Sequence, residues 1–470
     1  MANLLIIVVL ALAFLRNYLQ REIGELPSQF KYSLDGLIGI AAVFVVAKLL
    51  VSHRWTKIPI VYFFLFICFC YAVIAGAFIN SISPDVLFAG FRTYFKYVIV
   101  FLIPIAFIYT ARDREVQIKV LLFLVAIQGP VTLWQRVFDS QTSRMVTGDY
   151  IFGTMTTTSS IAIACSITII MALAFCLAKK LSIRAFIGIC LLMLVPAGLS
   201  ETKAVPIFLV AGAAILCFAQ RHLINSKQIV AASIGLFLFL TSFVAVYDLF
   251  YTRAGGEGFL AVITDKERMV DNYNFKGLEA KSLKFRERSS IVVGESEVPL
   301  DAIPYGTEVG RLDTIFMPFD VLLPHEVSRL VFGVGIGNID SRFGSGGDFR
   351  VLKERFGATT TTLSMLTWET GLLGVLAYLF LIACIAKDAL VLARREFEQQ
   401  TFAAGVLAVC AITVLSLVYA NLFHLPEISV LLAYMCGLIV SDRISLQKDI
   451  QQVAHQRVVF YEPIRKTVGS

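Results

Sequence analysis

Charged residues are scarce in this chain. Asp, Glu, Lys and Arg make up 16% of the 470 residues, whereas hydrophobic residues make up 57%. Soluble globular domains contain about 25% charged residues, so this composition excludes an ordinary soluble fold. The net charge of +7 is spread over the ends of short loops, which is typical of membrane proteins and does not favour nucleic acid as a partner.

The sequence also lacks a basic segment before its first apolar block, residues 3–15, and a clear cleavage site after it. These absences favour a membrane helix over a signal peptide. No cysteine lies between residues 250 and 362, and all nine lie within apolar blocks. We expect free thiols without disulfides, and we prefer this to a metal-binding pair at Cys68 and Cys70. Because no residues have metal-ligand spacing, we expect no metal and no cofactor.

Apolar blocks recur along the chain at the length that crosses a bilayer. They predict an all-α polytopic membrane protein of about twelve transmembrane helices, residues 3–15, 34–51, 58–79, 86–110, 116–138, 151–178, 183–199, 203–219, 228–249, 363–386, 401–419 and 427–441. Lys and Arg gather in alternate loops, whereas residues 81–85 and 421–426 contain neither. By the positive-inside rule, the cation-rich loops and both termini are cytoplasmic.

These spans divide the chain into four parts. Residues 1–249 carry nine spans, 250–362 form a large outer loop, 363–441 carry three more spans, and 442–470 form a polar, mobile cytoplasmic tail. Within the loop, apolar residues recur at helical spacing after Glu308. We expect two short amphipathic helices there, 308–317 and 318–331, separated by a break at Pro318.

Ionisable residues lie within or beside several spans, where charge is costly and needs a reason. On the predicted outer half these are Arg92, Arg136, Glu201, Lys203 and Glu369, and Lys96 follows Arg92 by four residues on the same helix face. Snorkelling and internal ion pairs explain single cases. Their gathering on one side favours a cleft for an anionic lipid headgroup, because Arg and Lys bind phosphate well. Alternatively, Glu201 and Lys203 form a local pair and Arg311 is a solvated helix residue.

Hydroxyl and glycine clusters stand at the outer ends of predicted helices. Helix capping uses one hydroxyl in residues 156–160 and one in residues 359–362. The others could bind sugar hydroxyls, in particular Thr359, Thr360, Thr361 and Thr362. The glycines at positions 333, 335 and 337 lack GxGxxG spacing. Close backbone packing is therefore favoured over an anion-binding backbone nest.

Four motifs together resemble the O-antigen polymerase and ligase superfamily: "LVFGVGIGN" (330–338), "WETGLLGVLAYLFLI" (368–382), "FGTMTTTSSIA" (152–162) and "SETKAV" (200–205). In that family a large periplasmic loop precedes a helix that opens with an E-x-G-L-L-G pattern. The family also has a Gly-Thr turn before a helix start, and its ligases have Ser-Arg where this chain has "SETKAV". The resemblance covers most of the chain in layout and about 40 residues in motif.

The resemblance implies a fold like the GT-C class of lipid-dependent glycosyltransferases, in a bacterial inner membrane. It implies a donor glycan on undecaprenyl pyrophosphate, metal-independent attack by an acceptor hydroxyl, and a flippase and a chain-length regulator as partners. The family's pyrophosphate-binding arginines correspond to Lys203, a change of residue type, and to Arg311; Arg92 and Arg136 are further candidates.

The acceptor hydroxyl also needs a general base. The candidates are Glu201, Glu308, His325 and Glu369, which the sequence does not rank. For His325, an ordinary surface position is the alternative interpretation.

One departure from the family pattern bears on the reaction. Ligases carry His, then Asn, Ser or Gln, nine more residues and Gly-x-x-Gly. Counting back from Gly371 places Thr360 and Thr361 at the first two positions, and threonine is not a base near neutral pH. The expected function is therefore a polymerase of lipid-linked repeat units. A ligase, and a flippase or transporter, are the alternatives, although the long outer loop and the lack of an internal repeat disfavour a transporter.

Overall fold

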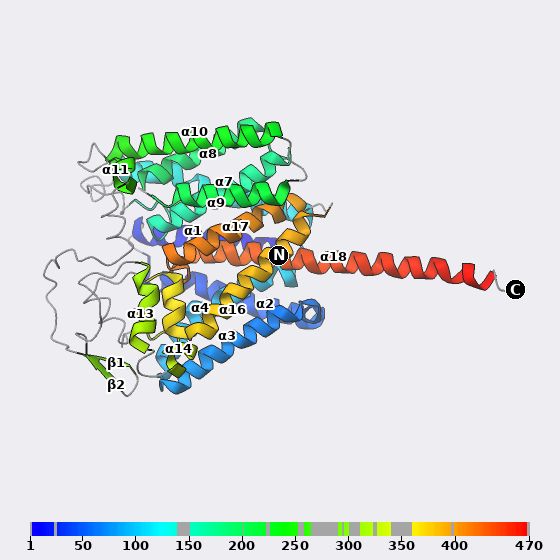
Figure 1. Cartoon of the computed structure of the whole chain (residues 1–470), viewed down its shortest axis with the longest axis horizontal. Helices are drawn as coiled ribbons and strands as arrows, with labels where there is room; N and C mark the ends of the chain where they lie inside the picture. Colours follow the sequence, from blue (N-terminus) through cyan, green and yellow to red (C-terminus); the bar gives the residue numbers. More distant parts are fainter. Residues whose placement is uncertain are drawn as a thin grey trace.

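The chain forms a bundle of long helices that run roughly alongside one another (Figure 1). The computed structural model describes residues 2–22, 26–138, 151–200, 202–221, 226–251, 258–264, 290–293, 296–299, 311–322, 327–339, 360–395 and 399–467. The first half of the chain contributes α1 (Ala2–Glu22), η1 (Ser28–Tyr32), α2 (Ser33–Val51), η2 (Arg54–Lys57), α3 (Ile60–Ile79), α4 (Pro84–Ala106), α5 (Ala111–Ala126), α6 (Gln128–Phe138), α7 (Thr158–Leu177), α8 (Ile183–Leu199), α9 (Val205–Gln220) and α10 (Ser226–Tyr251). The second half contributes α11 (Phe259–Thr264), the antiparallel pair β1 (Ser290–Val293) and β2 (Ser296–Pro299), α13 (Asp313–Leu322), α14 (Val327–Phe332), α16 (Thr362–Ala393), α17 (Gln400–Tyr419), η7 (Leu422–His424) and α18 (Pro426–Thr467).

The apolar helices confirm a polytopic membrane protein. Ten helical stretches among the described residues are long and apolar enough to cross a membrane, α5 and α6 forming one of them together. The shorter apolar helices α8 and α9 lie beside these. Each predicted span overlaps one of these helices, while the number of crossings stays a prediction. Since α1 extends to Glu22, Arg16 and Arg21 lie on a helix, although the predicted spans 3–15 and 34–51 had left them in the loop between.

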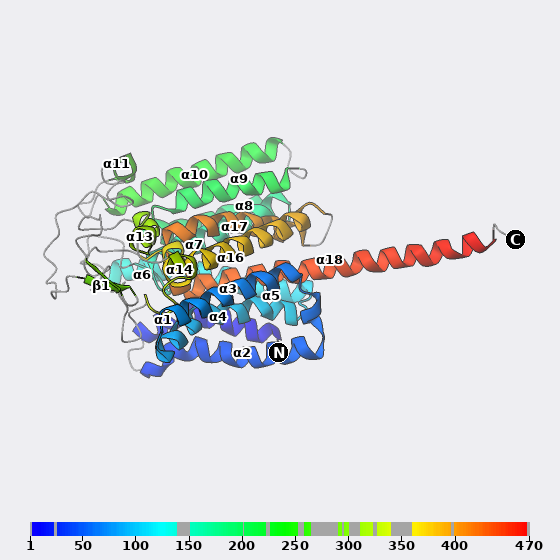
Figure 2. The same ribbon diagram turned by 60° about the horizontal axis from the view of Figure 1, so that its bottom comes forward.

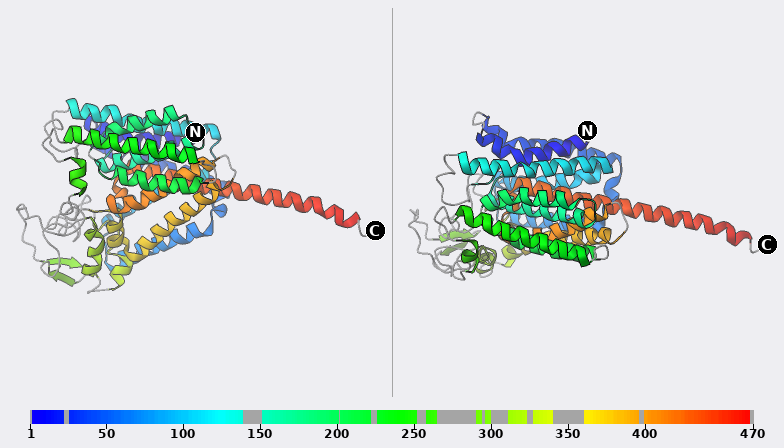
Figure 3. Two further views of the ribbon diagram at one scale, coloured as in Figure 1. Left: turned by 45° about the horizontal axis from the view of Figure 1, so that its top comes forward. Right: turned by 90° about the horizontal axis from the view of Figure 1, so that it is seen from above.

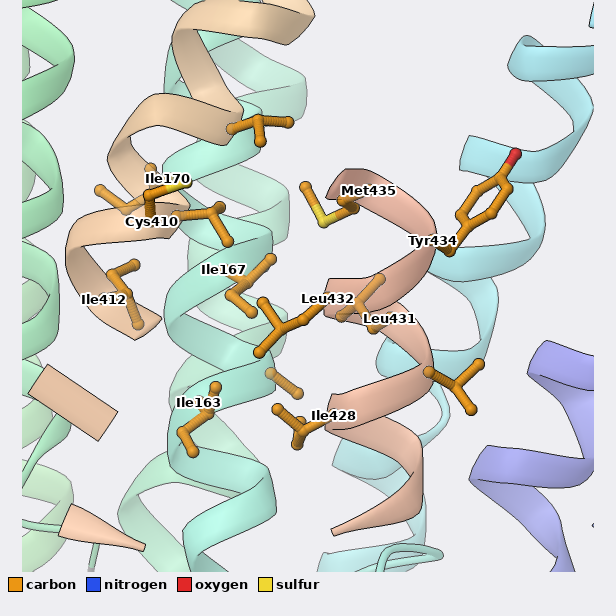
Figure 4. Close-up of a cluster of buried hydrophobic side chains, with 14 of the residues drawn as sticks. Ile163, Ile167, Ile170, Cys410, Ile412, Ile428, Leu431, Leu432, Tyr434 and Met435 are labelled. Carbon is orange, nitrogen blue, oxygen red and sulfur yellow. The ribbon is translucent and has the colours of Figure 1, made fainter. Parts of the chain in front are cut away.

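Three helices, α7, α17 and α18, form the centre of the bundle. The buried share of the apolar window is 83% in α7 and 72% in α17 and α18, compared with 17–39% in the other long candidates. Figure 4 shows where the three helices meet, at Ile163, Ile167, Ile170, Cys410, Ile412, Ile428, Leu431, Leu432 and Met435. The surrounding helices expose large apolar side chains such as Phe64 and Phe78 of α3, as a lipid-facing surface requires.

The two ends of the bundle differ. The elements α11, β1, β2, α13 and α14 lie at one end, which we name the loop end, and α18 projects from the other (Figures 1 and 3). The turned view in Figure 2 agrees with this arrangement. Chain order brings the ends of α6 and α17 and the starts of α4, α7, α9 and α16 to the loop end. The candidate residues of the site therefore lie towards this end.

The break expected at Pro318 is absent from the described part of the outer loop. A single helix, α13, runs from Asp313 to Leu322 through Pro318. One face of α13, with Ile315, Met317 and Val321, is buried against the bundle. We infer that this burial compensates for the one backbone hydrogen bond that proline removes. The second short helix, α14, is correspondingly shorter than predicted.

The tail expected from residue 442 begins instead inside a continuous helix. Helix α18 runs from Pro426 to Thr467, and Asp442 is buried. Arg114 of α5 donates to the Asp442 carboxylate at 2.8 Å. The neighbouring Arg443 lies 3.5 Å from Asp388 of α16. These ion pairs hold the middle of α18 against α5 and α16.

Breaking the Arg114–Asp442 pair is expected to destabilise the protein. Asp442→Asn leaves a half-buried guanidinium without its carboxylate, which costs about 3–5 kcal/mol for a buried pair. Thermal unfolding in detergent, followed in Arg114→Gln, Asp442→Asn and the double variant, checks this. The double variant should lose less than the sum of the single losses. The exposed pair Glu115–Lys119 is the control, and Lys119→Gln should leave unfolding unchanged. Additive losses would show that the two side chains do not act as a pair.

Candidate functional site

A break in α16 organises the loop end. Gly371 has φ 62° and ψ −169°, so the helix cannot continue its hydrogen-bond ladder there. The carbonyls of Trp368 and Glu369 accept hydrogen bonds from the amides of Val334 and Gly335 at 2.7 and 3.0 Å. The segment after α14 thus supplies the donors that the broken helix lacks. This couples the outer loop to α16 through the backbone.

The segment Gly333–Asn338, here named the glycine plug, packs against three helices. Gly333, Gly335 and Gly337 all have positive φ, which other residues adopt at a cost. A Cβ on Gly333 would lie 2.4 Å from the backbone of Glu369, and one on Gly337 would lie 2.3 Å from the carbonyl of Val86. A Cβ on Gly90 of α4 would likewise lie 2.5 Å from the amide nitrogen of Gly337 in the plug. The interpretation of these glycines as close backbone packing is confirmed.

Glu369, a candidate base, lies within this packing. Its side chain is fully buried, and its Oε1 atom accepts a hydrogen bond from the amide of Ile339 at 3.2 Å. Asn80 of α3 also holds the plug, since its Nδ2 atom donates to the carbonyl of Gly333 at 3.1 Å. Glu369 therefore helps to hold the glycine plug against α16, and its role as a general base stays a prediction.

Of the two cations matched to the family's arginines, Arg311 lies over one ring of an aromatic pair, and Lys203 precedes the helix that carries the other ring. The guanidinium of Arg311, which precedes α13, lies over the ring of Tyr419 at 4.8 Å. The Tyr419 ring contacts the edge of Phe208 at 5.5 Å between centroids. Phe208 belongs to the first turn of α9, and Lys203 stands just before that helix. Arg311, Tyr419, Phe208 and Lys203 together form what we name the Tyr419 shelf.

Two buried polar atoms beside the shelf have no hydrogen-bond partner among the described residues. They are the hydroxyl of Ser200 and the Oδ1 atom of Asn421. Ser200 lies in the same turn as Lys203, and Asn421 lies two residues after Tyr419. Buried polar atoms are normally paired with protein or water. Their position therefore fits a site that a polar ligand or water completes.

The threonines at the start of α16 are used mainly by the fold. Thr361 caps the helix and exchanges hydrogen bonds with Ser364. The hydroxyl of Thr362 donates to the carbonyl of Ala420 at 2.7 Å and accepts from the amide of Leu422 at 2.8 Å. Both residues are fully buried. Among the predicted sugar-binding threonines that the structure describes, Thr360 is half-buried.

Sequence analysis missed the turn between α17 and α18. Asn421 lies 3.0 Å from the Met365 sulfur and 3.4 Å from Nδ1 of His424. His424 is half-buried at the loop end, and its imidazole is a further candidate base. The neighbouring Phe423 packs on Tyr94 of α4 at 4.5 Å between centroids. The sequence signal that could have indicated this turn was its histidine. Sequence analysis had used residues 421–426 only as a loop without Lys or Arg.

Arg92 belongs to a different group of charges. It donates to Asp35 of α2 at 2.8 Å, and Lys96, one turn further along α4, lies 3.3 Å from the same carboxylate. The Arg92 guanidinium also lies over the ring of Tyr32 at 4.7 Å. Arg92 is therefore placed with η1 and α2 and not on the Tyr419 shelf. Arg136 lies half-buried in the last turn of α6.

The Gly-Thr turn before α7 is held by buried amide and carboxylate groups. Gly153, with φ 61°, donates its amide to Gln135 and accepts from the same side chain at 2.9 Å. Both carboxylate oxygens of Glu427, at the start of α18, accept from Thr156 at 3.0 and 2.9 Å. This motif therefore fixes the loop end of three helices. The hydroxyls of Thr154, Thr156, Thr157 and Ser160 take part in hydrogen bonds of the fold.

Four predicted site residues lie outside the described residues: Glu201, Glu308, His325 and Thr359. Among the residues that are described, no group of three or more His, Cys, Asp and Glu side chains could hold a metal ion. The structure thus places Arg311 over Tyr419 and Lys203 just before the helix of Phe208, whereas Arg92 lies in a second basic group, and a site shared by Lys203 and Arg311 stays a prediction. No protein-family model matches this chain, and no curated protein matches it.

Proposed function

We propose that the chain is a polymerase that joins undecaprenyl-pyrophosphate-linked oligosaccharide repeats into exopolysaccharide or O antigen. It would act on the periplasmic side of a bacterial inner membrane, with both termini in the cytoplasm. The observation that carries the proposal is the Tyr419 shelf, where Arg311 and the α9 turn with Lys203 flank one aromatic pair. The resemblance had matched these two residues, over a hundred positions apart in sequence, to pyrophosphate-binding arginines.

The chemistry of this reaction suits such a shelf. The acceptor hydroxyl oxygen bonds to the anomeric carbon of the donor, and the bond from that carbon to the pyrophosphate oxygen breaks. The electron pair leaves with the lipid pyrophosphate, and the hydroxyl proton passes to a base. Fixed cations stabilise the negative charge that develops on the leaving group. The proposed base is one of Glu201, Glu308, Glu369 and His325, or His424.

Glycan analysis of a strain that lacks this protein separates the proposal from its rivals. Loss of a polymerase leaves short, single-repeat glycans on the surface, because one repeat can still be transferred. Loss of a ligase leaves long unattached polymer, and loss of a flippase leaves no surface glycan. Long unattached polymer or a bare surface would refute the polymerase.

The leaflet in which single repeats accumulate gives a second test. Complementation with Lys203→Ala or Arg311→Ala should leave lipid-linked repeats on the periplasmic leaflet, where a polymerase would have consumed them. In a flippase the same variants would leave them on the cytoplasmic leaflet. Accessibility of the glycans to an added glycosidase in intact spheroplasts measures the difference, and Lys119→Ala is the matched control for loss of an exposed cation.

Polymerisation is expected to proceed unchanged in a metal chelator, because the sequence has no cluster with metal-ligand spacing and the leaving group is already activated. The measurement is chain elongation by purified protein in liposomes with and without EDTA. A strict requirement for Mg²⁺ would contradict this mechanism.

A further inference from the structure

Helix α18 continues past the end of the bundle. Its apolar window of membrane-spanning length is Pro426–Gln447, and Leu446 is still packed in the core, whereas Gln447 is exposed. Residues 448–467 extend the same helix by about 30 Å, at 1.5 Å per residue. None of the described elements lies beside this part in Figures 1, 2 and 3. We name residues 448–467 the α18 extension.

The sequence of the extension has an apolar stripe at coiled-coil spacing. From Leu446 onwards, apolar residues recur at alternating intervals of four and three residues, with one exception. The positions are Leu446, Ile450, Val453, Arg457, Phe460 and Ile464. In a continuous helix these positions share one face. Lys448, His455 and Glu462 stand on the opposite face, seven residues apart. The extension is therefore amphipathic, and its stripe starts at a residue that already packs in the bundle.

An amphipathic helix of this kind is typical of a surface that packs against another helix. A helix of about 20 residues is only marginally stable alone in water, because most helical stability in proteins comes from packing of the apolar face. The bilayer surface does not cover the stripe in this fold. The extension runs on in the direction of the spanning part of α18 and so leads away from the membrane (Figures 1 and 2).

Arg457 indicates what kind of helix fits the stripe. Two copies in one membrane point the same way, so a parallel pair of extensions would set Arg457 against Arg457, which is unfavourable. The extension also leaves the bundle beside its central helices, so the bundles of two copies would hold their extensions apart (Figure 3). An acidic side chain opposite Arg457 would pair its charge within the apolar contact. Lys448, Arg457, Arg465 and Lys466 outnumber Asp449 and Glu462 in the extension, which also favours an acidic partner.

We propose that the α18 extension docks an amphipathic helix of a different protein, which lays its apolar face on the stripe and sets an acidic side chain against Arg457. The extension lies at the end of the bundle opposite the Tyr419 shelf, so a docked partner leaves the shelf open to its substrates. That the partner is a cytoplasmic protein rests on the proposed function, which places this end of the bundle in the cytoplasm.

Photo-crosslinking of the full-length protein in living cells tests this docking surface. Benzoylphenylalanine replaces one residue at a time, either Val453 or Phe460 on the stripe, or His455 or Glu462 on the opposite face. Mass spectrometry then maps the cross-linked segment. The stripe positions should cross-link to a segment of another protein with apolar residues at helical spacing and an acidic residue among them. The opposite face should give little of this product.

Charge reversal at position 457 identifies the contact. Arg457→Glu should lower cross-linking from position 460 about 10-fold or more, because like charges across a contact repel. Arg457→Lys keeps the charge and should change it little. His455→Glu, which adds an acidic residue to the opposite face, is the matched control. Replacing the mapped acidic residue of the partner with Lys should restore cross-linking to Arg457→Glu. Val453→Asp, which places a charge in the stripe, should also lower it if Arg457→Glu fails to fold.

Several outcomes would overturn the proposal. Equal cross-linking from both faces, or cross-links to lipid alone, would show that the stripe is not a docking surface for a protein. A product of twice the mass of this chain, with no other protein in it, would mean that a second copy covers the stripe. A mapped segment without an acidic residue would exclude the pairing with Arg457. Because no polymer is formed in this assay, a failed polymerase test leaves its result unaffected.

Discussion

Replacing Arg311 with Ala is expected to lower the rate of chain elongation by about 10²–10³-fold, the usual cost of removing one fixed donor to developing negative charge. The guanidinium lies over Tyr419, which holds it in one orientation beside the α9 turn. Because the bond to the pyrophosphate breaks in the rate-determining step of this mechanism, the loss should fall on kcat more than on KM. Initial rates with lipid-linked repeats in liposomes measure both.

The aromatic platform offers a matched set of controls. Tyr419→Phe keeps a ring under the guanidinium and should cost little, whereas Tyr419→Ala removes the platform and should approach the effect of Arg311→Ala. Arg311→Lys keeps the charge but loses the planar fork, so an intermediate rate is expected. If Arg311→Ala elongates glycans as fast as Lys119→Ala, the shelf does not hold the leaving group.

The second large effect concerns the glycine plug. Gly333→Ala is expected to destabilise the protein by about 3 kcal/mol, from strain at positive φ and from overpacking. The added methyl group would lie 2.4–2.5 Å from backbone atoms of Glu369 and Thr370, which cannot move aside as a flexible side chain can. Thermal unfolding in detergent measures the loss. Elongation should fall with it, because the plug positions the start of α16.

Gly39→Ala is the matched control, since a Cβ there meets nothing within 4 Å. Glycine in the middle of a helix costs about 1 kcal/mol relative to alanine, so this variant should be as stable as the unaltered protein or more so. Equal melting temperatures for Gly333→Ala and Gly39→Ala would mean that the plug does not pack as described.

Hydropathy was sufficient to predict the helices, because apolar length alone decides which segments can cross a bilayer. It placed the end of α1 too early, at residue 15, because Arg16 and Arg21 were taken as loop residues. In the fold Arg16 remains on the helix and donates to the carbonyl of Lys31 at 2.9 Å. This hydrogen bond depends on a tertiary contact, which the hydropathy pattern of the sequence does not contain.

The site was predicted less completely than the fold. Whether Lys203 and Arg311 share one site depends on how α9, α13 and α17 meet, and the family resemblance alone predicted that they do. Arg92 looked like a third member because the charge pattern of the loops predicted all three residues on the outer side of the membrane. It proved to be paired with Asp35, a residue that sequence analysis had not singled out. Asn421 and His424 were missed because a short loop without Lys or Arg seemed a simple connection.

The glycine plug also constrains the order in which the protein can be assembled during synthesis. It binds Asn80, 253 residues earlier in the chain, and the carbonyls of Trp368 and Glu369, which are translated after it. Its amides at positions 334 and 335 therefore have no protein partners until α16 has been made and inserted. These two amides gain their partners only when α16 has been synthesised. The loop end is thus completed late in biogenesis, and a chain halted before residue 368 would leave α3 and α4 without this seal.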